Sequence, residues 1–360
     1  MSQEVYRRAL EVMIKRGGPY RGKDIPEFFT MMRELFTPDQ MAINNIMSKK
    51  PETAGAIAER AGRPAEEVRD LLETMADAGL CMTFPKGDTR YFMGAPFMPG
   101  IFEFQFLPGK TSERDKKIAH LIKDYKTAYK AAGQPRPMTF AGARVIPVDR
   151  TIEAGNQIHT YSQVATYIEK NDPVVVGNCY CRHAALLRGE DTHGMPMEVC
   201  MWFGPLALFA LERLGGRRVD KAEALELLKS CEEAGLIHMS RNTTEEVDFI
   251  CNCDRWHCEV VTDVLQQPKP ALFFNSGYEP VFDAEACVAC GACVERCPAS
   301  ALELGEDGPP ALDLARCFGC AVCATGCPEE AVSMAAKPGF PAPPRDIKGL
   351  AEAARASRGM

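Results

Sequence analysis

The sequence predicts a multidomain α+β protein with a mainly helical N-terminal part, a mixed central part and a small C-terminal part rich in cysteine. The chain has 360 residues, which is too long for one ordinary hydrophobic core. Apolar residues recur at helical spacing through much of the first third, whereas β-branched runs such as VVV and VDFI occur in the middle. Near the C-terminus, eight of the 16 cysteines form two matched runs. These changes of pattern indicate separate folding units.

Composition predicts a cytoplasmic protein that uses its cysteines to bind metal. The N-terminal residues MSQEVYRRALEVMIKRGG lack the apolar core and cleavage site of a secretory signal. The longest apolar stretch, VCMWFGPLALFALERL, is shorter than the roughly 20 residues that cross a bilayer, and we expect a buried helix there. Because the cytosol keeps thiols reduced, the 16 cysteines favour metal ligation over a disulfide framework.

The segment after residue 37 predicts a helix-turn-helix followed by a β-hairpin. Thr37 and Pro38 form a helix start, in which the hydroxyl caps free amides and proline fits the first turn. TAGAIAERAG and PAEEVRDLLETMADAGL then show helical spacing, and two strand-like runs flank residues 86–88. Together these elements resemble the winged-helix fold.

Charge argues against DNA recognition by the second of these helices. It carries Glu66, Glu67, Asp70 and Glu73 but only one basic residue, Arg69. Phosphate backbones are bound by lysine and arginine, so a helix of net charge about −3 is repelled by them. The sequence therefore favours a structural or protein-contact role for this domain, and nucleic acid is not an expected partner.

Two cysteine runs near the C-terminus share the spacing C-x2-C-x2-C-x3-C-P. The first begins CVACGACVERCP at residue 287 and the second begins CFGCAVCATGCP at residue 317. A cubane [4Fe-4S] cluster needs four thiolates around its corners, of which a short loop can supply three. Four-cysteine zinc sites are the competing interpretation, but zinc knuckles do not favour a triplet plus one cysteine and a proline.

Residues from about 278 to 334 resemble the two-cluster bacterial ferredoxins. Both runs and both prolines are present, and LELGEDGPPALDL between them is hairpin-like. In that family the fourth cysteine of each run ligates the other cluster. The resemblance therefore implies two [4Fe-4S] clusters whose ligands are, for one, Cys287, Cys290, Cys293 and Cys327, and for the other, Cys317, Cys320, Cys323 and Cys297.

The surroundings of the two runs are strongly acidic. Residues 279–330 contain ten acidic residues and two arginines, a net charge of −8, whereas the whole chain has −7. A compact acidic module is suited to docking a partner with a basic rim, although ordinary solubilising charge also accounts for it. Negative surroundings disfavour addition of an electron and so lower the reduction potential of a cluster.

The central part carries two further cysteine motifs. Cys179 and Cys181 follow the run VVVGN, and Cys251, Cys253 and Cys258 belong to VDFICNCDRWHC. In an extended segment, residues i and i+2 point to the same face, so each C-x-C offers two thiols in one direction. Cys200 lies close by in sequence. These six cysteines are candidate ligands of a third metal site that holds an iron–sulfur cluster or zinc. The alternative is a redox-active pair of thiols.

The central pattern resembles a group of ferredoxin-fused iron–sulfur oxidoreductase proteins, in which a cysteine-rich domain with C-x-C-R and C-N-C segments precedes a two-cluster ferredoxin. Here Asp254, Trp256 and His257 interrupt the later segment, and His193 stands near the position of another cysteine. The departure favours one extra metal site over two. The two histidines are secondary candidates as ligands.

Three functions fit these observations. The leading one is an iron–sulfur electron-transfer protein, a component of a larger oxidoreductase system that takes electrons from one redox protein and passes them to another. The alternatives are a reductase with a catalytic iron–sulfur site in the central domain, for which the catalytic residues are unknown, and a redox-sensing winged-helix regulator. No nucleotide fingerprint is present, so electrons must come from another protein or cofactor. The density of clusters and thiols suggests an anaerobic organism.

The predicted domain order has five parts. The boundaries follow the changes of pattern and the proline-rich linker PGFPAPPRD. They are residues 1–37, an N-terminal helical segment; 38–108, winged-helix-like; 109–270, the cysteine-rich central domain with the extra metal site; 271–336, the ferredoxin domain with two [4Fe-4S] clusters; and 337–360, the linker and a C-terminal helix.

Overall fold

The structure is a computed structural model that describes residues 2–133, 139–152, 164–305 and 307–357. Contacts divide the chain into two compact units, which are described separately. The first unit comprises residues 1–136, 177–192 and 205–217, and the second comprises 137–176, 193–204 and 218–360. This grouping distributes the expected central domain over both units, and the expected boundaries remain predictions. Among the described helices, none is long and apolar enough to span a membrane.

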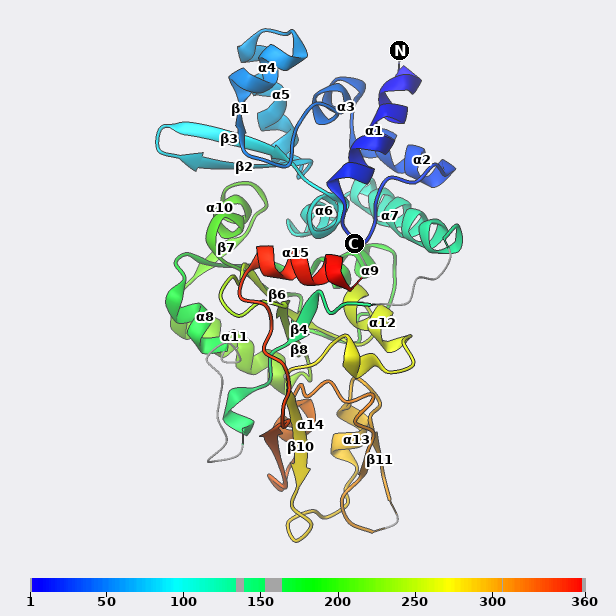
Figure 1. Cartoon of the computed structure of the whole chain (residues 1–360), viewed down its shortest axis with the longest axis vertical. Coiled ribbons are helices and arrows are strands. Elements are labelled where there is room, and N and C mark those ends of the chain that lie inside the picture. Colours follow the sequence, from blue (N-terminus) through cyan, green and yellow to red (C-terminus); the bar gives the residue numbers. More distant parts are fainter. Residues whose placement is uncertain (1, 134–138, 153–163, 306, 358–360) are drawn as a thin grey trace. The chain divides into compact units, whose positions relative to one another are not determined.

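The first unit is mainly helical (Figure 1). Its principal helices are α1 (Ser2–Arg16), α2 (Pro26–Leu35), α3 (Pro38–Asn44), α4 (Ala54–Ala61), α5 (Ala65–Asp77), α6 (Phe102–Phe106), α7 (Glu113–Ala131), α9 (Tyr180–Leu187) and α10 (Gly204–Arg213). Its three-stranded antiparallel sheet has the order β1-β3-β2, with β1 (Glu52–Thr53), β2 (Cys81–Lys86) and β3 (Thr89–Gly94).

Local signals in the sequence account for α3, α4 and the hairpin. At the start of α3, the Gln40 backbone N–H donates to the Thr37 hydroxyl at 3.3 Å, and the Gln40 side chain accepts from the Thr37 N–H at 3.0 Å. Gly62 ends α4 in the left-handed conformation, which glycine adopts without strain. The β2–β3 turn lies between Lys86 and Thr89, so the prediction of two strands around residues 86–88 is confirmed.

A buried aromatic cluster and one buried cation form the core of the first unit. The rings of Phe97 and Phe102 stack at 4.8 Å, and the Tyr125 ring meets both edge-on. Arg16 is 5% exposed, and its guanidinium donates to the side chain and carbonyl oxygens of Asn44 and to the carbonyl oxygen of Ala95. These bonds join α1, α3 and the end of the hairpin.

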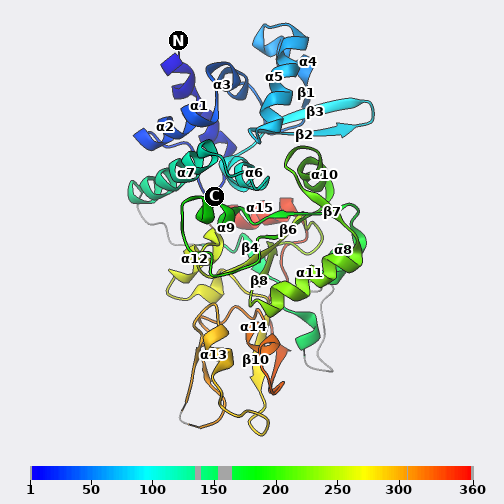
Figure 2. The ribbon, with the colours of Figure 1, turned by 180° about the vertical axis from the view of Figure 1, so that it is seen from behind.

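A six-stranded sheet dominates the second unit and has the order β4-β8-β9-β6-β5-β7. The strands are β4 (Ala143–Val145), β5 (Val174–Asn178), β6 (Glu198–Trp202), β7 (Arg217–Val219), β8 (Ile237–Arg241) and β9 (Phe249–Cys253). Helices α8 (Val164–Lys170) and α11 (Lys221–Glu233) lie side by side, as Figure 2 shows, and bury Ile168 and Leu228 in one core with Ile250 of β9. Helix α12 (Glu259–Leu265) contributes to a different core, which also contains Cys297.

The long apolar stretch does not form a single helix. Residues 198–202 pair as strand β6 with β9, and α10 begins only at Gly204, whose φ of 58° turns the chain. Leu208 and Leu211 of α10 are exposed. The prediction of one buried helix was therefore wrong, because valine, cysteine and tryptophan before the glycine suit a buried strand.

The C-terminal part of the second unit consists of two short hairpin-like sheets and small helices. Strand β10 (Tyr278–Phe282) pairs antiparallel with β13 (Val332–Ala336), so this part begins and ends side by side. Between them, β11 (Leu302–Glu303) pairs with β12 (Ala311–Leu312), which confirms the predicted hairpin. The remaining helices are α13 (Ala292–Arg296), α14 (Val322–Thr325) and the C-terminal α15 (Ile347–Ala356).

Candidate metal centres

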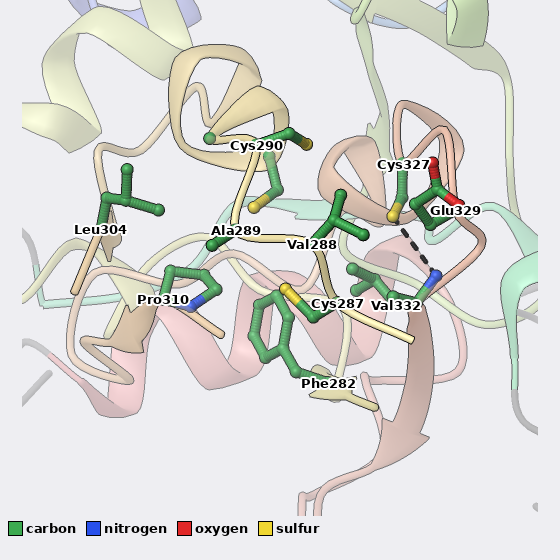
Figure 3. A pocket seen from close by; sticks show the side chains of 13 residues that line it. Phe282, Cys287, Val288, Ala289, Cys290, Leu304, Pro310, Cys327, Glu329 and Val332 are labelled. Atoms are coloured by element: carbon green, nitrogen blue, oxygen red, sulfur yellow. Dashed lines mark hydrogen bonds between the residues drawn. The ribbon is translucent and has the colours of Figure 1, made fainter. Parts of the chain in front are cut away.

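Four cysteines from both runs surround one cavity, which we call the outer cavity. Its lining includes Cys287, Cys290 and Cys293 of the first run and Cys327 of the second. Figure 3 shows Cys287, Cys290 and Cys327 around this space together with Val288 and Leu304. Cys290 is exposed, and the other three cysteines are partly buried.

The other four cysteines of the runs surround a second cavity, the inner cavity. Cys317, Cys320 and Cys323 of the second run line it together with Cys297 of the first. Cys297 and Cys317 are buried. Each cavity thus receives three thiols from one run and one from the other, which is the grouping that the resemblance to two-cluster ferredoxins implies.

The backbone conformation repeats between the two runs. Ala289 and Gly319, two residues after the first cysteine of each run, have φ of 53° and 67°. Gly291 and Ala321, four residues after it, have φ of 77° and 67° and begin helices α13 and α14. At Gly319 a side chain would collide with the carbonyl oxygen of Tyr278. When right-handed and left-handed backbone conformations alternate, successive N–H groups point into the concave side of the loop. Such a loop is suited to binding an anionic group.

Backbone N–H groups contact the cysteine sulfurs at equivalent positions. The N–H of Ala301 donates to Sγ of Cys297 and that of Ala331 to Sγ of Cys327, both at 3.3 Å (Figure 3 shows the second). Both donors lie four residues after the last cysteine of a run. Hydrogen bonds of this kind hold the sulfur orientation and raise the reduction potential of a bound cluster.

Burial raises the pKa of several thiols of the runs in the absence of metal. It raises the pKa of Cys320 and Cys323, and neighbouring cysteines reinforce the shift. Burial also raises the pKa of Cys317, although the backbone N–H of Gly319 opposes it. Thiolates are the ligand form, so loading of these sites must release protons.

Four thiols line each cavity, which is the number of thiolates that a cubane [4Fe-4S] cluster takes. Within the described residues, no group of three or more histidine, cysteine or acidic side chains converges on one point that could hold a metal ion. A tetrahedral zinc site needs four sulfurs at about 2.3 Å from a common centre. A cubane takes one thiolate at each of its four corners, and each cavity is lined by four thiols.

Four of the six central cysteines lie together in the second unit. Cys251 and Cys253 both belong to β9, and the thiol of Cys258 donates to Sγ of Cys253 at 3.2 Å. The register of β6 with β9 places Cys200 across from Cys251. Hydrogen bonds with Cys251 and Cys258, together with burial, raise the pKa of Cys253. The prediction that the C-N-C segment is extended is confirmed.

The other two central cysteines belong to the first unit and are not both in an extended segment. Helix α9 begins at Tyr180, so Cys181 is helical and Cys179 is the residue that precedes the helix. The expectation of an extended C-x-C at this point was wrong. The residues after the motif, HAALL, favour a helix, and the β-branched strand β5 ends at Asn178.

The loop between Cys253 and Cys258 contains polar and aromatic groups. Asp254 is 2% exposed, and its carboxylate accepts from the backbone N–H groups of Trp256 and His257 and approaches Nδ1 of His257 at 3.4 Å. The ring of His193 stacks on Trp256 at 4.3 Å. The ring of His257 lies 5.8 Å from that of His193, so the two candidate histidines are neighbours beside the loop that joins Cys253 to Cys258.

Two arginines that sequence reasoning missed tie the cysteine runs to the rest of the second unit. Arg255 donates to the carbonyl oxygen of Cys297 at 3.1 Å and to the hydroxyl of Ser300 at 3.0 Å. Arg296 donates to the carbonyl oxygens of Glu232 and Glu233 at the end of α11. Both contacts join residues more than 40 positions apart, and no local signal in the sequence indicates them.

Comparison with known families supports a cluster-binding role for the first of the two cysteine runs. Residues 280–303, which contain the whole first run, match the 4Fe-4S binding domain family. The chain therefore contains a 4Fe-4S binding domain, and it binds at least one [4Fe-4S] cluster. Comparisons with curated proteins and with solved structures found no match.

Proposed function

We propose that the protein is an electron-transfer component of a larger oxidoreductase system, with one [4Fe-4S] cluster in the outer cavity and one in the inner cavity. The observation that carries the proposal is the division of the eight cysteines into two sets of four, each with three thiols from one run and one from the other. A [4Fe-4S] cluster supplies one-electron redox chemistry. The 4Fe-4S binding domain at residues 280–303 supports this electron-transfer role.

The side chains assigned to each site have defined tasks. Cys287, Cys290, Cys293 and Cys327 are the proposed ligands in the outer cavity. In the inner cavity they are Cys297, Cys317, Cys320 and Cys323. The N–H groups of Ala301 and Ala331 hold the sulfurs of the two crossing cysteines, Cys297 and Cys327. Neither cavity is lined by a histidine, lysine or arginine.

A third metal centre, iron–sulfur or zinc, is proposed at the central cysteines. The closeness of Cys253 and Cys258, with Cys251 on the same strand and Cys200 across from it, supports the proposal. Cys179 and Cys181 belong to the first unit, and their role as ligands stays a prediction from the sequence. The inner-cavity residue Cys297 shares a hydrophobic core with Cys253 and Cys258, so electrons can pass between the two sites through packed atoms.

The residues from α3 to β3 are proposed to form a winged-helix domain with a structural or protein-contact role. Support comes from the element order α3-β1-α4-α5-β2-β3 and the antiparallel β2–β3 hairpin. Glu66, Glu67 and Asp70 of α5 are exposed, so a phosphate backbone would be repelled there. This charge disfavours the alternative of a redox-sensing DNA-binding regulator.

A catalytic role for the central site is the second candidate function. The observation in its favour is the buried Asp254 beside His257, next to the pair of thiols at Cys253 and Cys258. If this site reduces a substrate, Cys253→Ser abolishes substrate-dependent turnover with an artificial electron donor and leaves the signals of the two clusters intact. Turnover that survives this substitution rules out the central thiols as the catalytic site.

A reductive titration under anaerobic conditions tests the leading proposal. Two one-electron clusters in the runs predict uptake of about two electrons per chain by these sites, with the characteristic electron paramagnetic resonance signals of reduced [4Fe-4S] clusters. The reduced protein should then pass these electrons to an added acceptor. Absence of any reducible iron–sulfur signal in protein prepared without oxygen would contradict the proposal.

A further inference from the structure

The two cavities differ in their access to solvent. Cys290 of the outer cavity is exposed, whereas Cys297 and Cys317 of the inner cavity are buried. The inner cavity also contributes Cys297 and Phe318 to the hydrophobic core that holds Cys253. An external redox protein can therefore approach the outer set of thiols more closely than the inner set.

Exposed apolar side chains accompany the exposed thiol. Val288 is 62% exposed and Leu304 is 46% exposed, and both line the outer cavity with Cys290 (Figure 3). We call these three residues the outer collar. Apolar groups that are exposed together at a functional site mark a surface that a partner covers.

Carboxylates flank the outer collar. Glu329 lines the outer cavity and is exposed. Five more exposed acidic residues lie within two positions of residues that line this cavity: Asp283, Glu285, Glu295, Glu303 and Glu330. Among the described residues, none of these six carboxylates forms an ion pair within 4.0 Å.

The two arginines within residues 279–330 contact backbone carbonyl groups and none of the carboxylates around the outer collar. Arg296 donates to carbonyl oxygens of Glu232, Glu233 and Val322, and Arg316 donates to the carbonyl oxygen of Ala299. Their guanidinium groups are therefore engaged with the backbone away from the outer collar. The field at the collar is negative, which attracts a cationic surface and repels nucleic acid and anionic membranes.

We propose that the outer collar is the docking surface for a redox protein whose electron-exchange site is apolar at its centre and rimmed by lysine and arginine. The proposal rests on the electron-transfer function proposed above, and adds to it the surface used and the chemistry of the partner. Charge complementarity steers the encounter, and contact with Val288 and Leu304 excludes water between the two redox sites.

Binding to cytochrome c, a basic redox protein with an exposed haem edge, tests this inference. Isothermal titration calorimetry with the full-length, cluster-loaded protein gives the affinity, and stopped-flow absorbance gives the rate of electron transfer. The double substitution Glu285→Lys with Glu329→Lys should weaken binding by about tenfold or more and should flatten the dependence on salt, because two attractive charges become repulsive.

A double variant with the same change of net charge distinguishes an effect of the outer collar on binding from an effect of net charge alone. Glu226→Lys with Glu352→Lys makes the same change of net charge at exposed positions of α11 and α15 in the same unit. The control should bind cytochrome c nearly as the wild type does. An equal loss of affinity for cytochrome c in both double variants, or no loss of affinity in either, overturns the inference.

An apolar pair of variants gives a second, charge-independent test. Val288→Ser should weaken binding, whereas Leu272→Ser, at a side chain that is 68% exposed elsewhere in the unit, should not. Iron and acid-labile sulfide are measured on every variant. Protein without iron and sulfide refutes the proposed function itself, whereas loaded protein with collar-independent binding refutes only the docking surface.

Discussion

Arg255 donates a hydrogen bond to the carbonyl oxygen of Cys297 at 3.1 Å, and so joins the central cysteine loop to the crossing cysteine of the inner cavity. The same guanidinium bonds Ser300, and the loop that bears it runs from Cys253 to Cys258. A positive charge at this junction stabilises an added electron on the neighbouring site. The contact therefore has both a structural and an electrostatic consequence for the proposed electron path.

Arg255→Gln should lower the reduction potential of the inner cluster and leave that of the outer cluster unchanged. A unit charge at about 8 Å in a medium of effective dielectric constant of about 40 contributes about 1 kcal/mol. For a one-electron couple this corresponds to about 40 mV. A redox titration followed by electron paramagnetic resonance measures the shift. Arg255→Lys keeps the charge and should restore most of the potential; equal potentials for all three proteins would rule out the electrostatic effect.

Each proposed cluster takes three ligands from one run and one from the other, which predicts which single cysteine substitutions damage the same cluster. Cys327→Ser should damage the same cluster as Cys290→Ser, although the two residues belong to different runs. Cys297→Ser should instead act as Cys320→Ser does. Each substitution is expected to alter or remove about four irons per chain and to leave the other cluster's spectrum unchanged. If Cys327→Ser affected the cluster of Cys320, each run would hold its own cluster and the assignment would fail.

The sequence predicts local parts of this structure better than their assembly. The resemblance of the two cysteine runs to those of two-cluster ferredoxins implies two crossed sets of four cysteines, and the structure gathers the same thiols around two cavities, while ligation stays a prediction. The hairpin at residues 86–88 follows from a local turn signal. In contrast, Cys181 lies in a helix and not in an extended segment, because the apolar residues after it outweigh the preceding strand pattern.

Long-range contacts have no such local signal. Arg255 and Arg296 look like ordinary surface charges in the sequence, yet each donates to backbone carbonyl groups of a distant segment. The partition of residues 177–192 and 205–217 into the first unit likewise depends on tertiary packing. Periodicity and spacing report only on neighbours along the chain.

Arg16→Ala should destabilise the first unit by about 3 kcal/mol, because it leaves buried acceptors at Asn44 and Ala95 without their charged donor. Urea denaturation followed by far-ultraviolet circular dichroism measures the change. The exposed Arg69 is a suitable control, since Arg69→Ala should change stability by only about 0.5 kcal/mol or less. Equal losses for the two variants would show that the buried hydrogen bonds of Arg16 contribute little.

The winged-helix-like part should not bind DNA. At low salt, where phosphate contacts are strongest, an electrophoretic mobility shift assay with duplex DNA should show no retarded species, because the exposed face of α5 carries Glu66, Glu67 and Asp70. Retention that weakens as salt rises would contradict this expectation and would favour the redox-sensing regulator.

The most direct test of the account is the content of iron and acid-labile sulfide in full-length protein purified without oxygen. Two [4Fe-4S] clusters in the outer and inner cavities predict about eight irons and eight sulfides per chain, and a third cluster at the central cysteines would raise each number to about twelve. About eight irons with one zinc would make the central site a zinc site. About four irons and four sulfides, or zinc in place of iron at the two runs, would contradict the central claim that both cavities hold iron–sulfur clusters.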